Sequence, residues 1–165
     1  MKKIIAVLLA LLMLISLTAC SSGNGSQSGG TIEGDLEDIF NRMYEAADLD
    51  DETREFLAER TMFIEPDEET FPYFFFVEGV DYAEALVNEP LINAQAFSIG
   101  LVRVNDGVDV EALKKDIAAN ANPRKWICVE VDPSDVRVES VGNLILFIMA
   151  DNSEKYAEAF LGLAS

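Results

Sequence analysis

The apolar and polar positions in the second half of the chain predict alternating strands and helices. Residues 97–104 are rich in aliphatic and aromatic side chains, which indicates a strand. After a turn at Asn105-Asp106-Gly107, Asp109 can cap a helix over residues 110–120, where apolar side chains recur at helical spacing. Asn122-Pro123 is expected to stop this helix, because proline lacks the backbone N–H that a further helical turn would use.

Three further strands and a closing helix are expected after this proline. Residues 126–131 are expected to form a strand with apolar side chains on both of its faces. Residues 136–141 and 144–150 are expected to form two strands joined by Gly142-Asn143, a dipeptide typical of two-residue hairpin loops. The unbroken apolar run that opens the last strand is typical of a central strand in a sheet. A helix is expected to start at residues 151–154, with three apolar side chains turned inward: Tyr156, Phe160 and Leu163.

The first half of the domain, residues 31–93, is expected to form an acidic and mainly helical lead. Apolar residues recur at helical spacing over residues 36–44, and Asp35 is placed to cap that helix. Asp50 or Asp51 can cap a second, short helix. The inner face of this second helix is expected to carry three apolar side chains: Phe56, Leu57 and Met62.

Two further stretches of the first half allow a structural prediction. The aromatic run Phe71–Val77 is expected to be extended and buried, because large aromatic side chains supply much of the core of a small domain. The alternative is an exposed aromatic platform for a sugar or a peptide. Asp81-Tyr82-Ala83-Glu84 has the spacing of a capping box and predicts a short helix before Ala85-Leu86-Val87.

Together these elements predict the fold class. Residues 94–165 give a strand–helix–strand–strand–strand–helix unit behind the helical lead. A mostly antiparallel sheet covered by segregated helices is an α+β fold. Residues 31–165 have an ordinary length for one domain and contain enough apolar residues for a core, so we expect a single α+β domain.

The first 19 residues have the layout of a secretory signal peptide. Met1-Lys2-Lys3 is a short positively charged region, and residues 4–17 are apolar apart from Ser16. This apolar run is shorter than the about 20 residues that a helix needs to cross a bilayer. We therefore expect residues 1–19 to be a cleaved signal peptide rather than an anchor helix.

The segment Leu17-Thr18-Ala19-Cys20 resembles the lipobox of bacterial lipoproteins. The resemblance implies a diacylglyceryl thioether on Cys20, cleavage before Cys20, and often acylation of the new N-terminus with palmitate or a similar fatty acid. Two or three acyl chains form a stable anchor, whereas one chain is marginal. Residues 20–30 are then the lipidated cysteine and a flexible linker of Ser, Gly, Asn and Gln, and the domain is expected at the extracytoplasmic face of the cell membrane.

The charge of the chain narrows the choice of partner. The formal net charge is −18, and it falls to −20 once the two lysines of residues 1–19 are removed. Nucleic acid is excluded, because phosphate contacts need Lys and Arg. An anionic membrane surface attracts basic segments, so membrane lipid is expected to be contacted through Cys20 alone. Residues 31–89 carry nineteen acidic side chains and three arginines. This negative charge is expected to keep the domain soluble, and the alternative is that it binds a cation or a basic partner.

The sequence contains few patterns that indicate catalysis. Histidine is absent, which removes the commonest general base and the commonest metal ligand. There is no nucleophile elbow, phosphate-binding glycine loop or dinucleotide fingerprint. We therefore expect no catalytic residue, no cofactor and no metal, with a hydrolase based on paired carboxylates as the alternative. Cys128 lies among apolar residues and is expected to be buried and inert.

The acidic stretch that begins at Asp48 raises the question of a calcium site. An EF-hand loop needs glycine at its sixth position and glutamate at its twelfth. Counted from Asp48, the twelfth residue is Glu59, but the sixth is Thr53. A solvated, acidic helix start is therefore the favoured interpretation, since acidic side chains stabilise helix N-termini.

Arg124, Lys125 and Trp126 form the most basic point of this acidic chain and are the candidate ligand or partner site. A basic pair beside an indole ring can bind a carboxylate, a phosphate or the acidic strand of a partner. The alternative is a solvated turn with Trp126 packed into the core, because a connection between a helix and a strand normally lies at the surface.

Four stretches of the second half carry a resemblance to a known family: residues 81–86, 112–117 and 122–129, and the hairpin around Gly142-Asn143. They resemble an uncharacterised domain of small lipoproteins from Gram-positive gut bacteria of the clostridial type. The resemblance implies a Gram-positive cell surface, and it provides no catalytic residues to carry over to this chain.

The leading functional hypothesis is a membrane-anchored, non-enzymatic domain that binds a partner protein or a small ligand at the cell envelope. The alternative is an accessory solute- or cation-binding lipoprotein that serves a membrane transporter. The chain is short for a two-lobed solute receptor, which disfavours that alternative.

Overall fold

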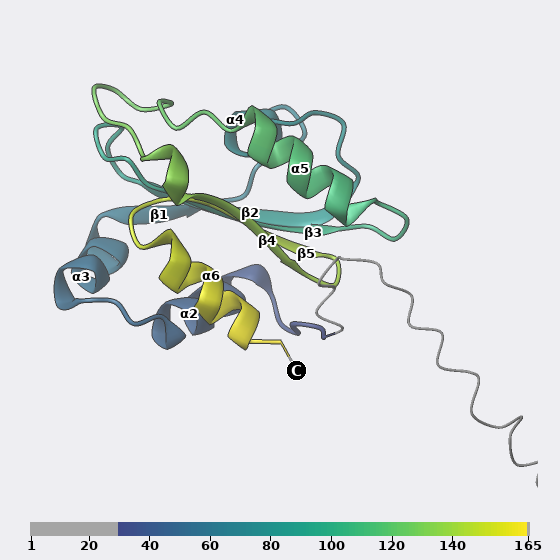
Figure 1. Cartoon of the computed structure of the whole chain (residues 1–165), viewed down its shortest axis with the longest axis horizontal. Helices are drawn as coiled ribbons and strands as arrows, with labels where there is room; N and C mark the ends of the chain where they lie inside the picture. The colour runs from purple at the N-terminus through teal and green to yellow at the C-terminus, as the bar shows by residue number, and fades with distance from the viewer. Residues whose placement is uncertain (1–29, 165) are drawn as a thin grey trace, which may run out of the picture.

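A computed structural model describes residues 30–164 of the chain. Within these residues, five strands form one antiparallel sheet in the order β1-β2-β3-β5-β4, and helices cover both of its faces (Figure 1). The strands are β1 (Thr61–Ile64), β2 (Tyr82–Pro90), β3 (Ser98–Val104), β4 (Val136–Val141) and β5 (Leu144–Met149). The helices are α2 (Leu36–Ala46), α3 (Asp51–Glu59), α4 (Phe71–Phe75), α5 (Val110–Asn120) and α6 (Ser153–Gly162), with the 3-10 helix η2 (Pro133–Asp135). The expected α+β class is confirmed.

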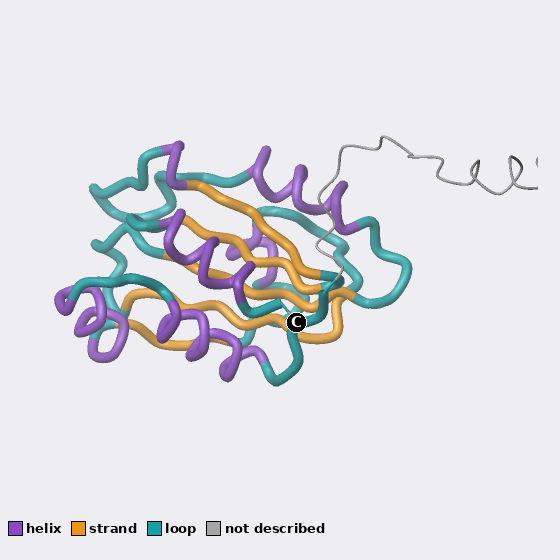
Figure 2. Tube along the Cα trace, turned by 60° about the horizontal axis from the view of Figure 1, so that its bottom comes forward, coloured by secondary structure: helices purple, strands orange, loops and turns teal. Residues whose placement is uncertain are grey.

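Two apolar clusters fill the space on the two sides of the sheet. α2 and α6 pack against one face, which Figure 2 turns toward the viewer, and α4, α5 and the segment from Trp126 to Val131 cover the other face. β5 lies between β3 and β4 and is buried throughout, as the apolar run predicts. Its side chains alternate between the clusters, with Leu144, Leu146 and Ile148 in the first and Ile145, Phe147 and Met149 in the second.

Local signals predict the helix starts and the hairpin well. α2, α3 and α5 begin at the expected aspartates, and each carboxylate accepts a hydrogen bond from the backbone N–H three residues later. The pairs are Asp35 with Asp38, Asp50 with Thr53, and Asp109 with Ala112, at 2.8, 2.8 and 3.0 Å. Gly142-Asn143 forms the expected turn between β4 and β5.

The aromatic run from Phe71 is helical, so the prediction of an extended segment is wrong. Pro72 lies in the first turn of α4, where a helix tolerates proline, and Phe76 ends the helix in the left-handed conformation. The core interpretation of the run is correct, because Phe71, Phe74 and Phe75 are buried.

The helix predicted at residues 81–84 is a strand in the structure. β2 pairs with β1 on one side and with β3 on the other, and these long-range ladders outweigh the local capping-box pattern. β1 was also missed, and Met62 is an exposed residue of this strand rather than part of the inner face of α3. The acidic lead therefore supplies two strands of the sheet.

The strand predicted at residues 126–131 is an irregular segment. Cys128 has a φ of 62° and is exposed, so the expectation of a buried thiol is wrong. β4, and not this segment, pairs with β5 in the sheet. The segment instead packs against the second apolar cluster through the buried side chains of Trp126 and Val131.

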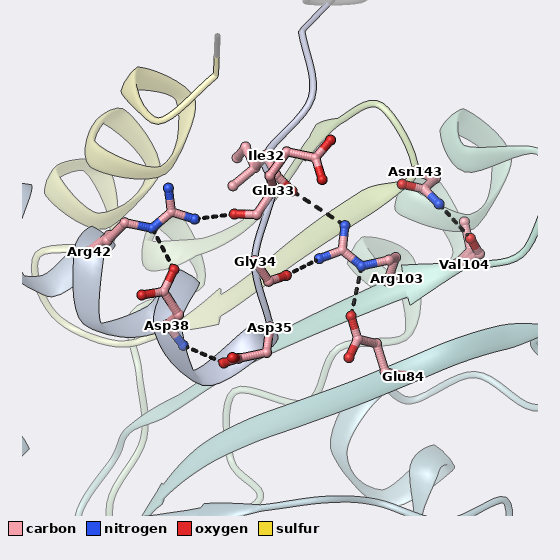
Figure 3. Close-up of polar contacts among 10 residues, drawn as sticks. All are labelled: Ile32, Glu33, Gly34, Asp35, Asp38, Arg42, Glu84, Arg103, Val104 and Asn143. Atoms are coloured by element: carbon pink, nitrogen blue, oxygen red, sulfur yellow. Dashed lines mark hydrogen bonds and ion pairs between the residues drawn. The ribbon is translucent and has the colours of Figure 1, made fainter.

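Arg103 ties the N-terminal segment to the sheet, as Figure 3 shows. Its Nη2 donates to the carbonyl of Gly34 at 2.9 Å and its Nη1 to that of Ile32 at 3.4 Å. Its Nε forms an ion pair with Glu84 at 2.7 Å, which joins β3 to β2. We call these contacts the Arg103 strap.

The strap fixes where the chain enters the domain. The carbonyl oxygen of Gly30 lies beside the β4–β5 turn, 3.5 Å from the position that a Cβ on Gly142 would take. The expected signal peptide, Cys20 and the linker up to residue 29 lie outside the described residues. Within residues 30–164, none of the helices combines the length and the apolar character needed to cross a membrane.

Candidate functional site

A buried polar cluster joins β2, β3 and the irregular segment after α5. Lys125 Nζ lies 2.6 Å from Glu89 Oε1 and 3.1 Å from Ser98 Oγ, and the Ser98 hydroxyl donates to the same carboxylate oxygen. The sheet register pairs Asn88 with Ile99, which places Glu89 and Ser98 as cross-strand neighbours at the end of the ladder. The Lys125 side chain is 4% exposed and that of Glu89 is 10% exposed, so the ion pair is shielded from water.

Three aromatic rings surround the Lys125 ammonium. Its Nζ lies 5.3 Å from the ring centre of Tyr73, 5.5 Å from that of Phe74 and 5.4 Å from that of Trp126. Cations are attracted to the faces of such rings at these distances. Burial lowers the pKa of Lys125, and the nearby Glu89 carboxylate opposes that shift without cancelling it.

The structure separates the three residues of the predicted site. Arg124 is exposed and pairs with Glu130, a neighbour in the same segment. Lys125 points inward, and Trp126 is 6% exposed and belongs to the second apolar cluster. The three side chains do not form one basic, aromatic surface, so the structure matches the alternative interpretation, in which Trp126 packs into the core.

Ser98 and Lys125 lie as close together as a serine nucleophile and its amine base, but a substrate cannot reach the Ser98 hydroxyl. A serine can attack a substrate when an adjacent base takes its proton. Here Ser98 is 0% exposed and its hydroxyl faces the Glu89 carboxylate. In this conformation the cluster works as a clamp that holds the irregular segment against the sheet.

Four exposed apolar side chains lie on the segments that form or adjoin this clamp. Tyr73, Leu91, Ile92 and Ile127 are 55, 56, 62 and 63% exposed. Tyr73 lies over Lys125, and the Ile127 N–H donates to the carbonyl of Asn93 at 3.0 Å, which brings the two loops together. We call these four side chains the apolar rim. Grouped exposed apolar residues are unusual on a soluble domain and mark interaction surfaces.

The apolar rim and the chain entry lie at opposite ends of the sheet. Leu91 and Ile92 of the rim lie in the β2–β3 connection, whereas Gly30 lies beside the β4–β5 turn, which is at the other end of β3 and β5. Figure 1 shows how these strands run through the sheet. β3 spans seven residues, which corresponds to about 23 Å of strand. A tether at the N-terminus therefore leaves the rim on the far side of the domain.

Sequence reasoning named Lys125 but missed its partners. Glu89 and Ser98 are isolated polar residues in two strands, and only the register of β2 and β3 reveals that they meet. Leu91 and Ile92 gave a usable signal, since they are consecutive large apolar residues directly after Pro90. At the calcium candidate, Asp50 instead caps α3, and no group of three or more metal-binding side chains is present within residues 30–164.

Comparison with known proteins adds no assignment. No family model matches the chain, and no curated protein or solved structure matches it. A functional assignment therefore depends on the geometry of the molecule itself.

Proposed function

We propose that this protein is a lipid-anchored, extracytoplasmic lipoprotein whose domain binds a partner protein of the cell envelope through the apolar rim. One observation carries the proposal: four large apolar side chains stay exposed around a buried ion pair, at the end of the domain that faces away from the chain entry. The lipobox at Cys20 and the linker supply the anchor in this proposal.

The rim favours a partner protein over the lipid surface. A membrane-inserting patch would have to face the bilayer, whereas the tether leaves the domain at the opposite end. Without the two lysines of residues 1–19, the chain carries a formal charge of −20, which disfavours close contact with anionic lipids. The partner surface that fits is apolar at its centre and basic at its periphery.

The clamp prepares the rim for binding. The contacts of Lys125 to Glu89 and Ser98 fix the segment that carries Ile127 against the strands that lead to Leu91. A preorganised surface loses less conformational entropy when it binds. The second candidate function, an accessory solute- or cation-binding lipoprotein for a transporter, does not account for the rim.

Site-specific photo-crosslinking tests this proposal. The full chain is expressed in its natural host, with a photo-crosslinking residue at Ile92, at Ile127 or, as the matched control, at Leu161. Leu161 is also an exposed apolar residue, 39% exposed, but it lies on α6. We expect Ile92 and Ile127 to give the same discrete adduct, and the Leu161 position not to give it.

A second substitution decides whether the adduct reflects the rim. Leu91→Ser in the Ile127 crosslinking chain should abolish the adduct while the amount of lipoprotein stays the same. An adduct that survives Leu91→Ser, or that forms equally from Leu161, contradicts the proposal. An adduct of two copies of this chain, or one with lipid alone, also contradicts it, because the partner would then not be another envelope protein.

A further inference from the structure

The strand β2 is longer than its neighbour β1, so part of its edge has no strand beside it. The ladder between the two strands ends where Ile64 pairs with Val87, and Pro66 lacks the backbone N–H that a further pair would use. The β2 residues 82–86 therefore have a strand, β3, on one side only. A groove of about 460 Å³ lies along this free edge, and its other walls are Glu65, Pro66 and the start of α2.

The backbone N–H and C=O groups of Ala85 face the side of β2 on which the groove lies. Successive residues of an antiparallel strand direct these groups to opposite neighbours. The Leu91 N–H donates to the Arg60 carbonyl on the β1 side at 2.9 Å. Counting back from Leu91 in steps of two residues reaches Val87 and then Ala85, which therefore face the same side. Ala85 is the first such residue beyond the end of β1, and it lines the groove.

The side chains along this free edge are small or turned away from it. Ala83 lies at a register shift of β2, has no partner residue in β3 and is exposed. The methyl group of Ala85 belongs to the second apolar cluster, so it does not cover the edge. A free strand edge with room beside it is a template on which an extended peptide can pair through its backbone.

Four carboxylates and no basic side chain line the groove. The carboxylates are those of Asp35, Glu37, Glu65 and Glu84. Glu84 forms an ion pair with Arg103, which Figure 3 shows. The other three carboxylates form no ion pair within residues 30–164. Their uncompensated negative charge favours an occupant with basic side chains.

We propose that this groove binds an extended, basic peptide segment of a partner protein by β-strand addition. The segment pairs with the backbone of Ala85, and its Lys or Arg side chains lie near Glu37 and Glu65. Charge favours such a segment over a second copy of this chain, whose formal net charge is −18. The groove borders the start of β2, whereas Leu91 of the apolar rim follows its end. This site is therefore additional to the partner binding proposed for the rim, and either can fail without the other.

Titration of the full chain in zwitterionic detergent micelles with a blocked peptide of alternating lysine and threonine, followed by NMR, tests the proposal. We expect saturable shifts of the Ala83 and Ala85 backbone amide signals, and hydrogen exchange at Ala85 should slow at least about tenfold at saturation. The same peptide methylated at every backbone nitrogen, and a peptide of alternating glutamate and threonine, are the matched probes and should give no saturable shift. Absence of saturation by the lysine peptide at millimolar concentration, or an equal response to either matched probe, overturns the proposal. The same shifts on concentrating the chain without peptide also overturn it, because the occupant would then be a second copy.

Charge-neutralising substitutions test the role of the carboxylates without disturbing the core. Glu37 and Glu65 are both exposed, so the double variant Glu37→Gln, Glu65→Gln should keep its melting temperature. Its affinity for the lysine peptide should fall at least about threefold. The double variant Glu154→Gln, Glu158→Gln removes the same charge from exposed positions of α6 that do not line the groove, and it should bind normally. Undiminished binding by the first variant, or an equal loss in the second, contradicts the assigned contacts.

Discussion

Lys125 shows how a single side chain can hold a loop in place. It is a buried cation whose hydrogen-bond partners, Glu89 and Ser98, come from two adjacent strands. Removing one member of a buried ion pair leaves the other as an uncompensated charge, which is more costly than losing the pair as a whole.

Lys125→Met should therefore lower the free energy of unfolding by about 3–5 kcal/mol. The double variant Lys125→Met, Glu89→Gln should recover part of this loss, because the neutral amide still accepts from Ser98 and needs no counter-ion. Urea unfolding of the single and double variants measures both values. A single variant as stable as the parent would show that the clamp does not form, and Arg124→Met, at the exposed neighbour, should have little effect.

The same residues show what the sequence could and could not provide. The basic residues around Lys125 identified it as unusual in this acidic chain. The inward orientation of its side chain, however, depends on Glu89, which is 36 positions away in the chain. Trp126 and Cys128 look alike in an apolar tetrapeptide, yet the first is buried and the second is exposed, because the backbone turns through a positive φ at Cys128. Sequence periodicity cannot anticipate such a change of direction.

At the level of elements, local signals were reliable where local bonds decide the structure. Asp35, Asp50 and Asp109 each cap a helix through a bond three residues away, and such bonds are visible in the sequence. β2 follows the opposite rule, since its pairing with β1 and β3 overrides the capping-box spacing at residues 81–84. Strand pairing depends on contacts between distant residues, which a single sequence does not display.

The contact between α4 and β3 leads to a test of packing between elements. A Cβ at Gly100 would lie 2.7 Å from the Phe75 ring, and Phe75 is 0% exposed. Gly100→Ala should therefore destabilise the fold by about 1–3 kcal/mol, because the ring has no free space into which to move.

Thermal unfolding followed by circular dichroism measures this effect. Gly162→Ala is the matched control, because nothing lies within 4 Å of the added methyl group, and alanine favours the helical backbone. The Gly100→Ala, Phe75→Leu double variant should regain part of the lost stability. Equal melting temperatures for Gly100→Ala and the parent would contradict the tight packing of α4 on β3.

At the level of the whole molecule, the two cysteines provide a matched pair for testing the anchor. Cys20→Ala should release the protein from the membrane fraction into the medium or leave it unprocessed, and it should lose incorporation of a clickable palmitate analogue. Cys128→Ala should keep both membrane association and labelling, although Cys128 is exposed in the folded domain. Labelling that follows Cys128 rather than Cys20 would contradict the lipobox interpretation.

The positions of the chain entry and the apolar rim also determine how the domain responds to mechanical load. In a protein anchored at one end and bound to a partner at the other, tension runs along the strands, from the Arg103 strap toward the β2–β3 connection. Under such shear the ladder bonds of β2, β3 and β5 resist together rather than opening one after another. If the proposed anchor and the proposed partner both hold the protein, the antiparallel sheet is the part of the domain that bears the pull between them.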